Sequence, residues 1–190
     1  MNADDVRRTA AESSALKQRF FAESAPRIVE VGETIARALR DGGKVLAFGN
    51  GGSAADAQNL ASELVGRFQK TRKGLPAIAL TTDTSILTAV ANDFGFEAVF
   101  ARQVEALGRP GDVAVAISTS GRSPNVLAGA RSARALGLRI VGLTGNGGGA
   151  LAPLVDQLID VPHPLAARIQ EVHIMVVHLL CQIVEEAMGA

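Results

Sequence analysis

Val45-Leu-Ala-Phe-Gly-Asn-Gly-Gly-Ser-Ala-Ala-Asp-Ala-Gln-Asn59 is an apolar run that leads into a glycine-rich turn and then into a helix-forming segment. Residues 45–48 are too few and too apolar for anything but a buried strand. Residues 50–52 allow positive φ angles where a side chain would obstruct a ligand. Ser53 is placed to cap the next helix, whose free N–H groups favour a phosphate. The pattern predicts a strand, an anion-binding loop and a helix, although a plain tight turn can carry the same residues.

Composition indicates one domain over residues 1–190, because 47% of the residues are hydrophobic and the chain is long enough for a full core. Nineteen basic residues balance nineteen acidic ones, and no long basic run is present. This balance excludes an electrostatic footprint for nucleic acid or for an anionic membrane. The expected partner is a small molecule or another copy of the chain.

The compartment is predicted from what the sequence lacks. Cys181 is the one cysteine, so no internal disulfide can form, and it suits a reducing cytosol as a core residue. The N-terminus has no uninterrupted apolar segment of signal-peptide type, and no run of about 18 apolar residues occurs. We expect a soluble cytoplasmic protein.

Alternating strand and helix patterns predict an α/β fold with a parallel sheet. Two N-terminal helices within residues 1–41 should meet near Pro26, and a core over 44–162 should precede a C-terminal helix over 165–188. After the first strand and helix, buried strands are expected at 77–80, 112–117, 139–143 and 157–161, and helices at 84–91, 97–107 and 124–136.

A second anion-binding loop is predicted at Ser118-Thr-Ser-Gly-Arg-Ser-Pro124. Its four hydroxyls, on Ser118, Thr119, Ser120 and Ser123, exceed what a turn needs, and Pro124 suits the first position of a helix. A hydroxyl-rich helix cap is the alternative. Neither loop fits G-x-x-x-x-G-K-[ST] or G-x-G-x-x-G, which favours a sugar phosphate over a nucleotide. Because parallel strands present their carboxyl ends at one edge, these loops should converge on one crevice.

Three segments resemble one family: Phe-Gly-Asn-Gly-Gly-Ser-Ala-Ala-Asp-Ala-Gln at 48–58, Ala-Ile-Ser-Thr-Ser-Gly-Arg-Ser-Pro-Asn-Val at 116–126 and Ala-Arg-Ile-Gln-Glu-Val-His at 167–173. They are similar to the sugar-isomerase (SIS) domain family, specifically its phosphoheptose isomerases, nearly end to end. The resemblance implies a flavodoxin-like three-layer sandwich around a parallel five-stranded sheet, with an N-terminal helical extension. It also implies a homotetramer with active sites between subunits.

The implied reaction is the isomerisation of sedoheptulose 7-phosphate to D-glycero-D-manno-heptose 7-phosphate, the first step towards activated heptoses and the heptose of lipopolysaccharide. By the resemblance, Glu63 and His178 are the acid–base pair. The implied substrate-binding residues are Asn50, Gly51, Gly52, Ser53, Glu63, Asn92, Asp93, Ser118, Thr119, Ser120, Ser123 and Gln170. Glu63, Gln170 and His178 also match zinc ligands.

The chemistry of an aldose–ketose isomerase agrees with these residue types. A proton must move between adjacent carbons through an enediol, which needs a carboxylate-strength base and a second group for the oxygen protons. Taken alone, Glu63 reads as a solvated helix charge and His178 as a core histidine. Only the resemblance favours the catalytic interpretation.

Helix geometry constrains the ligands. Gln170 and His178 lie about 80° apart and about 12 Å along a helix, so they reach one ion only by leaning together. His173 is about 140° from His178, so it should be a supporting or interface residue. Asn59 and Glu63 form an i, i+4 pair on one helix face, which suits two ligands.

Asn59 is a departure from the family, which usually has histidine there. An amide oxygen is a poorer zinc ligand than imidazole, so we expect zinc to bind weakly or to be replaced by another divalent ion. The alternative function is a non-catalytic SIS-domain interaction protein of the replication-initiator-binding type, or a sugar-phosphate sensor. Glu63, Gln170 and His178 favour the enzyme, and Asn59 favours the alternative.

Overall fold

The computed structural model describes residues 1–189 and contains one five-stranded parallel sheet in the order β2-β1-β3-β4-β5. The strands are β1 (Val45–Gly49), β2 (Ala77–Ala79), β3 (Val113–Ser118), β4 (Arg139–Gly145) and β5 (Gln157–Val161). The helices are α1 (Ala3–Arg40), α2 (Gly52–Val65), α3 (Thr84–Phe94), α4 (Val99–Leu107), α5 (Pro124–Ala135) and α6 (Ala166–Ala187), with 3-10 turns η1 (Phe96–Ala98) and η2 (Ala152–Leu154). The predicted α/β fold is confirmed.

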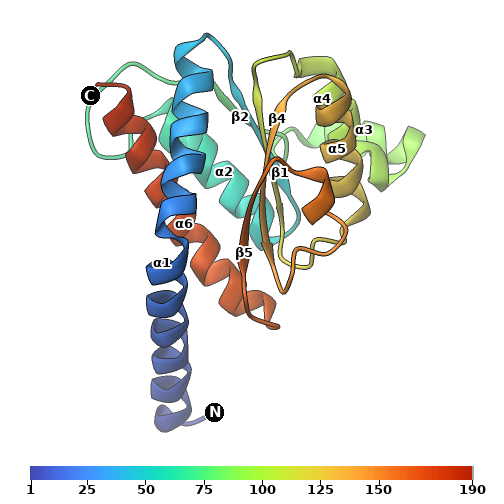
Figure 1. Cartoon of the computed structure of the whole chain (residues 1–190). Helices are drawn as coiled ribbons and strands as arrows, with labels where there is room; N and C mark the ends of the chain where they lie inside the picture. Colours follow the sequence, from blue (N-terminus) through green and yellow to red (C-terminus); the bar gives the residue numbers. More distant parts are fainter. Residues whose placement is uncertain (190) are drawn as a thin grey trace.

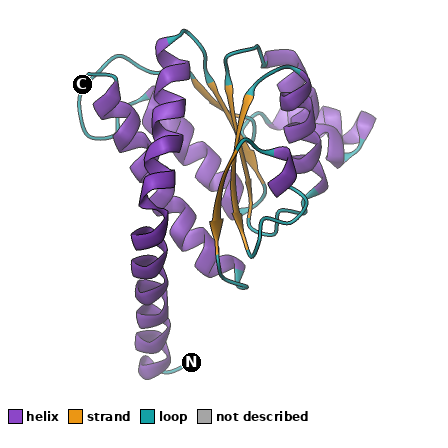
Figure 2. Ribbon diagram, in the orientation of Figure 1, coloured by secondary structure: helices purple, strands orange, loops and turns teal. Residues whose placement is uncertain are grey.

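Helices cover both faces of the sheet, with α1, α2 and α6 on one side and α3, α4 and α5 on the other (Figure 1, Figure 2). Alternate strand residues supply the two cores, because successive side chains of a strand point to opposite faces. In β1, Val45 packs against the α1, α2 and α6 layer, whereas Leu46 and Phe48 pack against the other layer. The strands are therefore buried on both faces, as their unbroken apolar runs predict.

The N-terminal segment is one helix of 38 residues, so the predicted break near Pro26 is wrong. Pro26 is exposed, and water can solvate the carbonyl that its missing N–H leaves free. The C-terminal part of α1 packs on α6, so closely that a Cβ at Gly32 would lie 2.6 Å from Ile183. The N-terminal half projects beyond the body of the molecule (Figure 1).

Two further expectations need correction. The second strand is not buried: β2 lies at the edge of the sheet, and Ile78 is exposed. Its edge position, with one neighbouring strand, explains the difference. Asn92 and Asp93, expected in a break between helices, lie inside α3, because the chain turns only at Gly95, whose φ is +84°.

Helix α6 is long and apolar enough by composition to cross a membrane. Its apolar residues, including Val176, Val177 and Leu180, are instead buried in the core against α1 and the sheet. Two polar residues of α6, His173 and Glu185, are also buried there with hydrogen-bond partners. The helix is a core element of the α/β domain.

Candidate active site

The loop after β1 leads straight into α2. Gly51 is the N-cap of α2 and has φ +56°, and no side chain caps this end, so the predicted Ser53 cap is wrong. Ser53 is buried in the first turn of the helix. The N–H groups of Ser53, Ala54 and Ala55 donate to the carbonyls of Asn50 and Gly51, so the positive end of the α2 dipole is what favours an anion here.

The loop after β3 gathers hydroxyls. Ser118 Oγ lies 3.1 Å from Ser123 Oγ, and Ser120 Oγ accepts a hydrogen bond from the backbone N–H of Arg122. Gly121 must be glycine, because its φ is +60° and a Cβ would lie 1.9 Å from the carbonyl oxygen of Gly148. The loop opens onto the start of α5, where Pro124 takes the predicted first position.

Asn50 and Asn125 bridge the two loops. Each side-chain amide donates to the other's Oδ1, at 2.8 and 2.9 Å. The bridge spans neighbouring strands β1 and β3, where the strand order reverses and open α/β sheets bind ligands. Asn125 is buried and was not predicted, although its place one residue after Pro124 in the second motif was a usable signal.

A cavity of about 210 Å³ lies beside the second loop. It is lined by Thr119, Ser120, Arg122, Asn146, Pro164, Ala166 and Ile169. Arg122 adds a cation to the predicted set of hydroxyls and helix N–H groups, and its position inside the S-T-S-G-R-S motif could have identified it. The arrangement suits a phosphate.

Glu63 and His178 lie on α2 and α6, two helices that pack against each other, and both residues are half-buried. Burial raises the pKa of the Cys181 thiol, and the negative charge of Glu63 raises it further. Glu63 therefore lies near the face of α6 that carries Cys181 and, one turn before it, His178. The ring of Phe68 packs on the His178 ring with centroids 5.7 Å apart. A carboxylate and an imidazole thus face one region of the α2–α6 interface.

Two acceptors on the same stretch of α2 have no partner. Asp56 Oδ2 and Asn59 Oδ1 are buried without a hydrogen bond from any described residue. Burial raises the pKa of the Asp56 carboxyl to about 6. Buried acceptors without a hydrogen bond are rare in folded proteins, so each calls for a further partner such as a water or a ligand. Asp56 was not predicted, and an aspartate one turn into a helix that begins at an anion loop was the available signal.

The residues that resemble zinc ligands form a poor ligand set for zinc in this chain. The Gln170 amide lies against Gly52 at the start of α2, where a Cβ would be 2.4 Å from Gln170 Nε2. Glu63 lies about 16 Å further along the axis of α2. Within residues 1–189, no group of three or more His, Cys, Asp or Glu side chains could hold a metal ion. The set offers one imidazole and one carboxylate, where catalytic zinc takes three protein ligands.

Other predicted residues lie apart from the crevice. Asn92 and Asp93 are exposed on α3 and hydrogen-bond to each other at 2.7 Å. His173 is fully buried and donates from Nε2 to the Thr144 carbonyl at 2.9 Å. Burial lowers the pKa of His173 to about 4, so it is neutral and supports the end of β4 rather than an interface.

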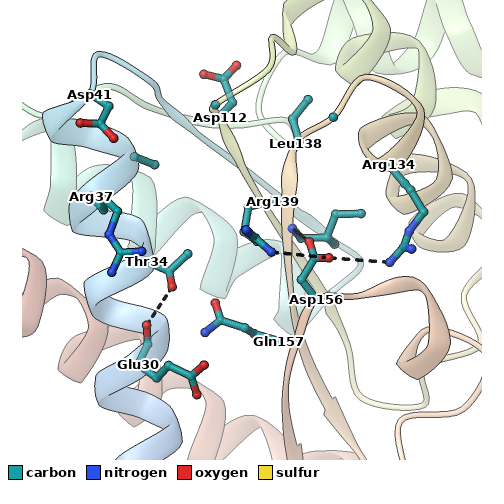
Figure 3. Close-up of a pocket in the computed structure, with 14 residues that line it drawn as sticks. Glu30, Thr34, Arg37, Asp41, Asp112, Arg134, Leu138, Arg139, Asp156 and Gln157 are labelled. Atoms are coloured by element: carbon teal, nitrogen blue, oxygen red, sulfur yellow. Dashed lines mark hydrogen bonds and ion pairs between the residues drawn. The ribbon is translucent and has the colours of Figure 1, made fainter.

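A larger cavity, about 680 Å³, lies at the opposite, amino end of the sheet, between α1 and the starts of β4 and β5 (Figure 3). Its charged and amide residues include Arg37, Asp112, Arg134, Arg139, Asp156 and Gln157. None of the predicted site residues lines it. Arg37 and Arg134 lie in the last turns of α1 and α5, where a positive charge is favourable beside the helix dipole without any ligand.

Known proteins similar to this chain share its fold and much of its sequence. The SIS domain matches residues 10–145. A phosphoheptose isomerase of Roseiflexus sp. (strain RS-1) is 57% identical over 173 residues, which cover 91% of this chain and 88% of that protein. A phosphoheptose isomerase of Aquifex aeolicus (strain VF5) is 55% identical over 183 residues, which cover 96% of each chain.

A solved structure is similar to this chain over nearly the whole length of both. The phosphoheptose isomerase of Neisseria gonorrhoeae superposes with a TM-score of 0.91 at 45% identity, over 96% of this chain and 98% of that one. The likeness includes α1 and the C-terminal helix as well as the sheet, since the matched span is nearly complete.

Proposed function

The chain belongs to the SIS domain family and, within it, to the phosphoheptose isomerases, and on this premise we propose that it converts sedoheptulose 7-phosphate to D-glycero-D-manno-heptose 7-phosphate. The observation that carries the proposal is the combination of two phosphate-type loops at the reversal of strand order with a half-buried carboxylate and a half-buried imidazole on the packed helices α2 and α6. The chain is a phosphosugar isomerase.

The phosphate end of the substrate binds at the loop after β3. Ser120 and Ser123 hydroxyls, the amino end of α5 and Arg122 donate hydrogen bonds to phosphate oxygens. The Asn50–Asn125 bridge holds this loop against the loop after β1, so that the helix ends α2 and α5 face the same ligand.

The reaction moves one proton from C1 to C2 and another from O1 to O2. The Glu63 carboxylate takes the proton from C1 of the open-chain ketose while the carbonyl oxygen on C2 gains a proton, which gives the enediol. The O1 hydroxyl then loses its proton, and Glu63 returns a proton to C2, which completes the aldose. His178 moves the protons of O1 and O2.

The spacing of the two parts favours a long substrate. Gln170 lies near the loops, and His178 is about 12 Å further along α6. In an open-chain seven-carbon sugar 7-phosphate, the phosphate and the reacting carbons are at opposite ends of the molecule. A substrate of this length suits phosphate binding at one end of α6 and proton transfer two turns away.

Zinc is proposed as a weakly held ion. Asn59 supplies an amide oxygen where the family usually has imidazole, and Gln170 lies at the other end of α2. A weak site of this kind should also accept another divalent ion. In this proposal Glu63 and His178 carry out the proton transfers, and no step depends on the metal ion.

We further propose a homotetramer in the cytoplasm. Two observations support assembly: none of residues 84–94 is buried although Ile86 and Phe94 are apolar, and the N-terminal half of α1 projects from the body (Figure 1). Assembly would cover these surfaces and bring Asn92 and Asp93 of α3 to a site between subunits. In the cell, the product would enter the synthesis of activated heptoses, including those of lipopolysaccharide.

A non-catalytic SIS-domain protein, which binds a replication initiator or senses a sugar phosphate, is the second candidate. One observation favours it, namely Asn59 at the position that the family fills with histidine. The retained Glu63, Gln170 and His178 favour the enzyme instead.

Incubation with sedoheptulose 7-phosphate, followed by NMR detection of the aldose phosphate, separates the two candidates. We expect product with the wild-type protein, with and without added zinc. Absence of product under both conditions, in protein that is folded by circular dichroism, would leave the non-catalytic role. Light scattering of the same sample tests the tetramer, and a monomer with full activity would refute it.

A further inference from the structure

Residues 66–76, here called the strap, form no helix or strand and join α2 to the edge strand β2. It crosses from the end of α2 to α6, where the Phe68 ring packs on the ring of His178 with centroids 5.7 Å apart. Phe68 is half-buried by this contact. The position of the strap therefore determines what covers one face of His178.

Glu185 of α6 holds the strap by its backbone. Its carboxylate accepts hydrogen bonds from the N–H groups of Phe68, Gln69 and Lys70, at 3.2, 2.9 and 2.9 Å. The residue is only 2% exposed. Burial alone would raise the pKa of the Glu185 carboxyl, but these three donors and the Arg72 guanidinium hold it below its usual value. Glu185 is thus a buried carboxylate ion committed to the strap.

Arg72 connects Glu185 to the end of α2. Arg72 Nε lies 3.2 Å from Glu185 Oε1, without the alignment of a hydrogen bond, so the pairing is between charges. Both side chains are buried, at 6% and 3% exposed. The Arg72 guanidinium also donates 2.8 Å hydrogen bonds to the carbonyl oxygens of Glu63 and Leu64. A guanidinium there satisfies carbonyls that the end of a helix leaves free.

The strap therefore touches both members of the acid–base pair, through the backbone of Glu63 and the ring of His178. Glu185 and Arg72 form the one buried ion pair among the described residues in which both side chains are below 10% exposed. A buried pair is costly to desolvate, so stability alone is a weak reason for it. Its contacts fix the end of α2 relative to α6.

We propose that Glu185 is a positioning residue for the isomerase, which sets the placement of Glu63 and His178 by tying the strap and the end of α2 to α6. The proposal rests on the proposed function for its catalytic consequence, but its structural half stands separately. Glu185 itself does not touch the substrate in this proposal. It acts through Phe68 and Arg72.

The test compares Glu185→Gln with Glu186→Gln, which makes the same change at the next residue of α6. Glu186 is exposed, and among the described residues its side chain accepts a hydrogen bond from Gln182. Glu185→Gln should lower kcat about tenfold and leave KM for sedoheptulose 7-phosphate within twofold, because the phosphate loop is distant. Glu186→Gln should leave both constants unchanged. A kcat within twofold of wild type in folded Glu185→Gln would overturn the proposal.

Phe68→Leu shows whether Glu185 acts through the strap. It should lower kcat by itself, and the loss in the double variant Phe68→Leu with Glu185→Gln should be much smaller than the product of the two single losses. Full multiplication of the losses, with equal melting temperatures, would refute action through the ring and leave a merely structural carboxylate. If Glu185→Gln does not fold, Arg72→Lys, which keeps the buried charge, takes its place with the same expected kcat loss.

A structural readout separates this proposal from the proposed function. NMR contacts between the Phe68 and His178 rings, and slow exchange of the Phe68 and Gln69 amides, should be present in wild type and lost in Glu185→Gln. If the wild type shows no isomerase activity, the proposed function fails while these signals still test the strap. Their persistence in Glu185→Gln would remove Glu185 as the residue that positions it.

Discussion

The two ends of the sheet differ in whether their polar groups have ion-pair and hydrogen-bond partners. At the amino end, the larger cavity brings together arginines and carboxylates, and Arg134 and Arg139 pair there with Asp156 (Figure 3). Asp112 accepts from Lys44 Nζ at 2.5 Å and from two backbone N–H groups. Gln157 Oε1 is also buried there, without a hydrogen bond from any described residue. At the carboxyl end the cavity is small, but helix ends are uncapped and Asp56 is left unsatisfied.

The contrast teaches that neither volume nor charge identifies a site in this fold. Paired charges stabilise the protein and offer little to a ligand, whereas uncapped helix ends and unpaired acceptors are left for one. The same kind of change, made at both ends of the sheet, should therefore alter kcat or KM only at the carboxyl end.

Removal of the proposed base should have the largest effect. Glu63→Gln should lower kcat by about 10²–10⁴-fold, the usual contribution of a general base. Glu30→Gln, which changes a carboxylate beside the amino-end cavity, should leave kcat unchanged. Both are measured by the NMR assay, and full activity in Glu63→Gln would show that another group is the base.

Loss of the loop hydroxyls should affect binding next. Ser120→Ala with Ser123→Ala should raise KM, since each hydrogen bond to a charged group contributes about 1.5–3 kcal/mol. Arg139→Gln removes a charge but should not change KM, because Arg139 lines the amino-end cavity, at the end of the sheet opposite the loop. Equal sugar-phosphate affinity in the double variant and wild type, by calorimetry, would remove this loop from the site.

Asp56 should make stability depend on pH. Burial raises its pKa from 3.8 to about 6, so the folded chain binds a proton more tightly than the unfolded one. Stability should therefore fall as pH rises from about 4 to 6, and the whole cost should be present above pH 6. Asp56→Asn should raise the free energy of unfolding by about 1–3 kcal/mol at pH 8 and leave it unchanged at pH 4.

Asp112→Asn is the matched change at the amino end. It should destabilise the protein at pH 8, because it breaks the ion pair with Lys44. Urea unfolding of both variants at the two pH values provides the comparison. A stability loss in Asp56→Asn at pH 8 would mean that its carboxylate has a partner in solution, such as water or a cation.

The metal prediction has the smallest expected effect. Asn59→His should raise zinc affinity about tenfold, because an imidazole joins Glu63 on one helix face without a backbone change. Calorimetric zinc titration of both proteins measures it. Equal affinity would show that position 59 does not contact the ion.

The sequence predicted most of the sheet, because each strand is an apolar run ended by glycine or a turn, and it predicted the second loop and Pro124 at the start of α5. The break near Pro26 failed because proline only disfavours a helix and packing on α6 outweighs it. Asp56 and Arg122 were missed because an isolated charge in a helix or loop does not show its surroundings. Glu185 depends on contacts more than a hundred residues away, which no local pattern reveals.

The pair of hydrogen bonds between the Asn50 and Asn125 amides can also be lost through a slow chemical reaction of Asn50. Asn50 precedes Gly51, and asparagine before glycine is the pair most open to spontaneous deamidation, because the glycine nitrogen can reach the side-chain carbonyl unhindered. Conversion of Asn50 to aspartate would turn a donor to Asn125 Oδ1 into an acceptor and add a negative charge beside the phosphate loop. Ageing of the protein should therefore appear as a mass gain of one unit together with a rise in KM, and the bridge, by holding the Asn50 amide, should delay it.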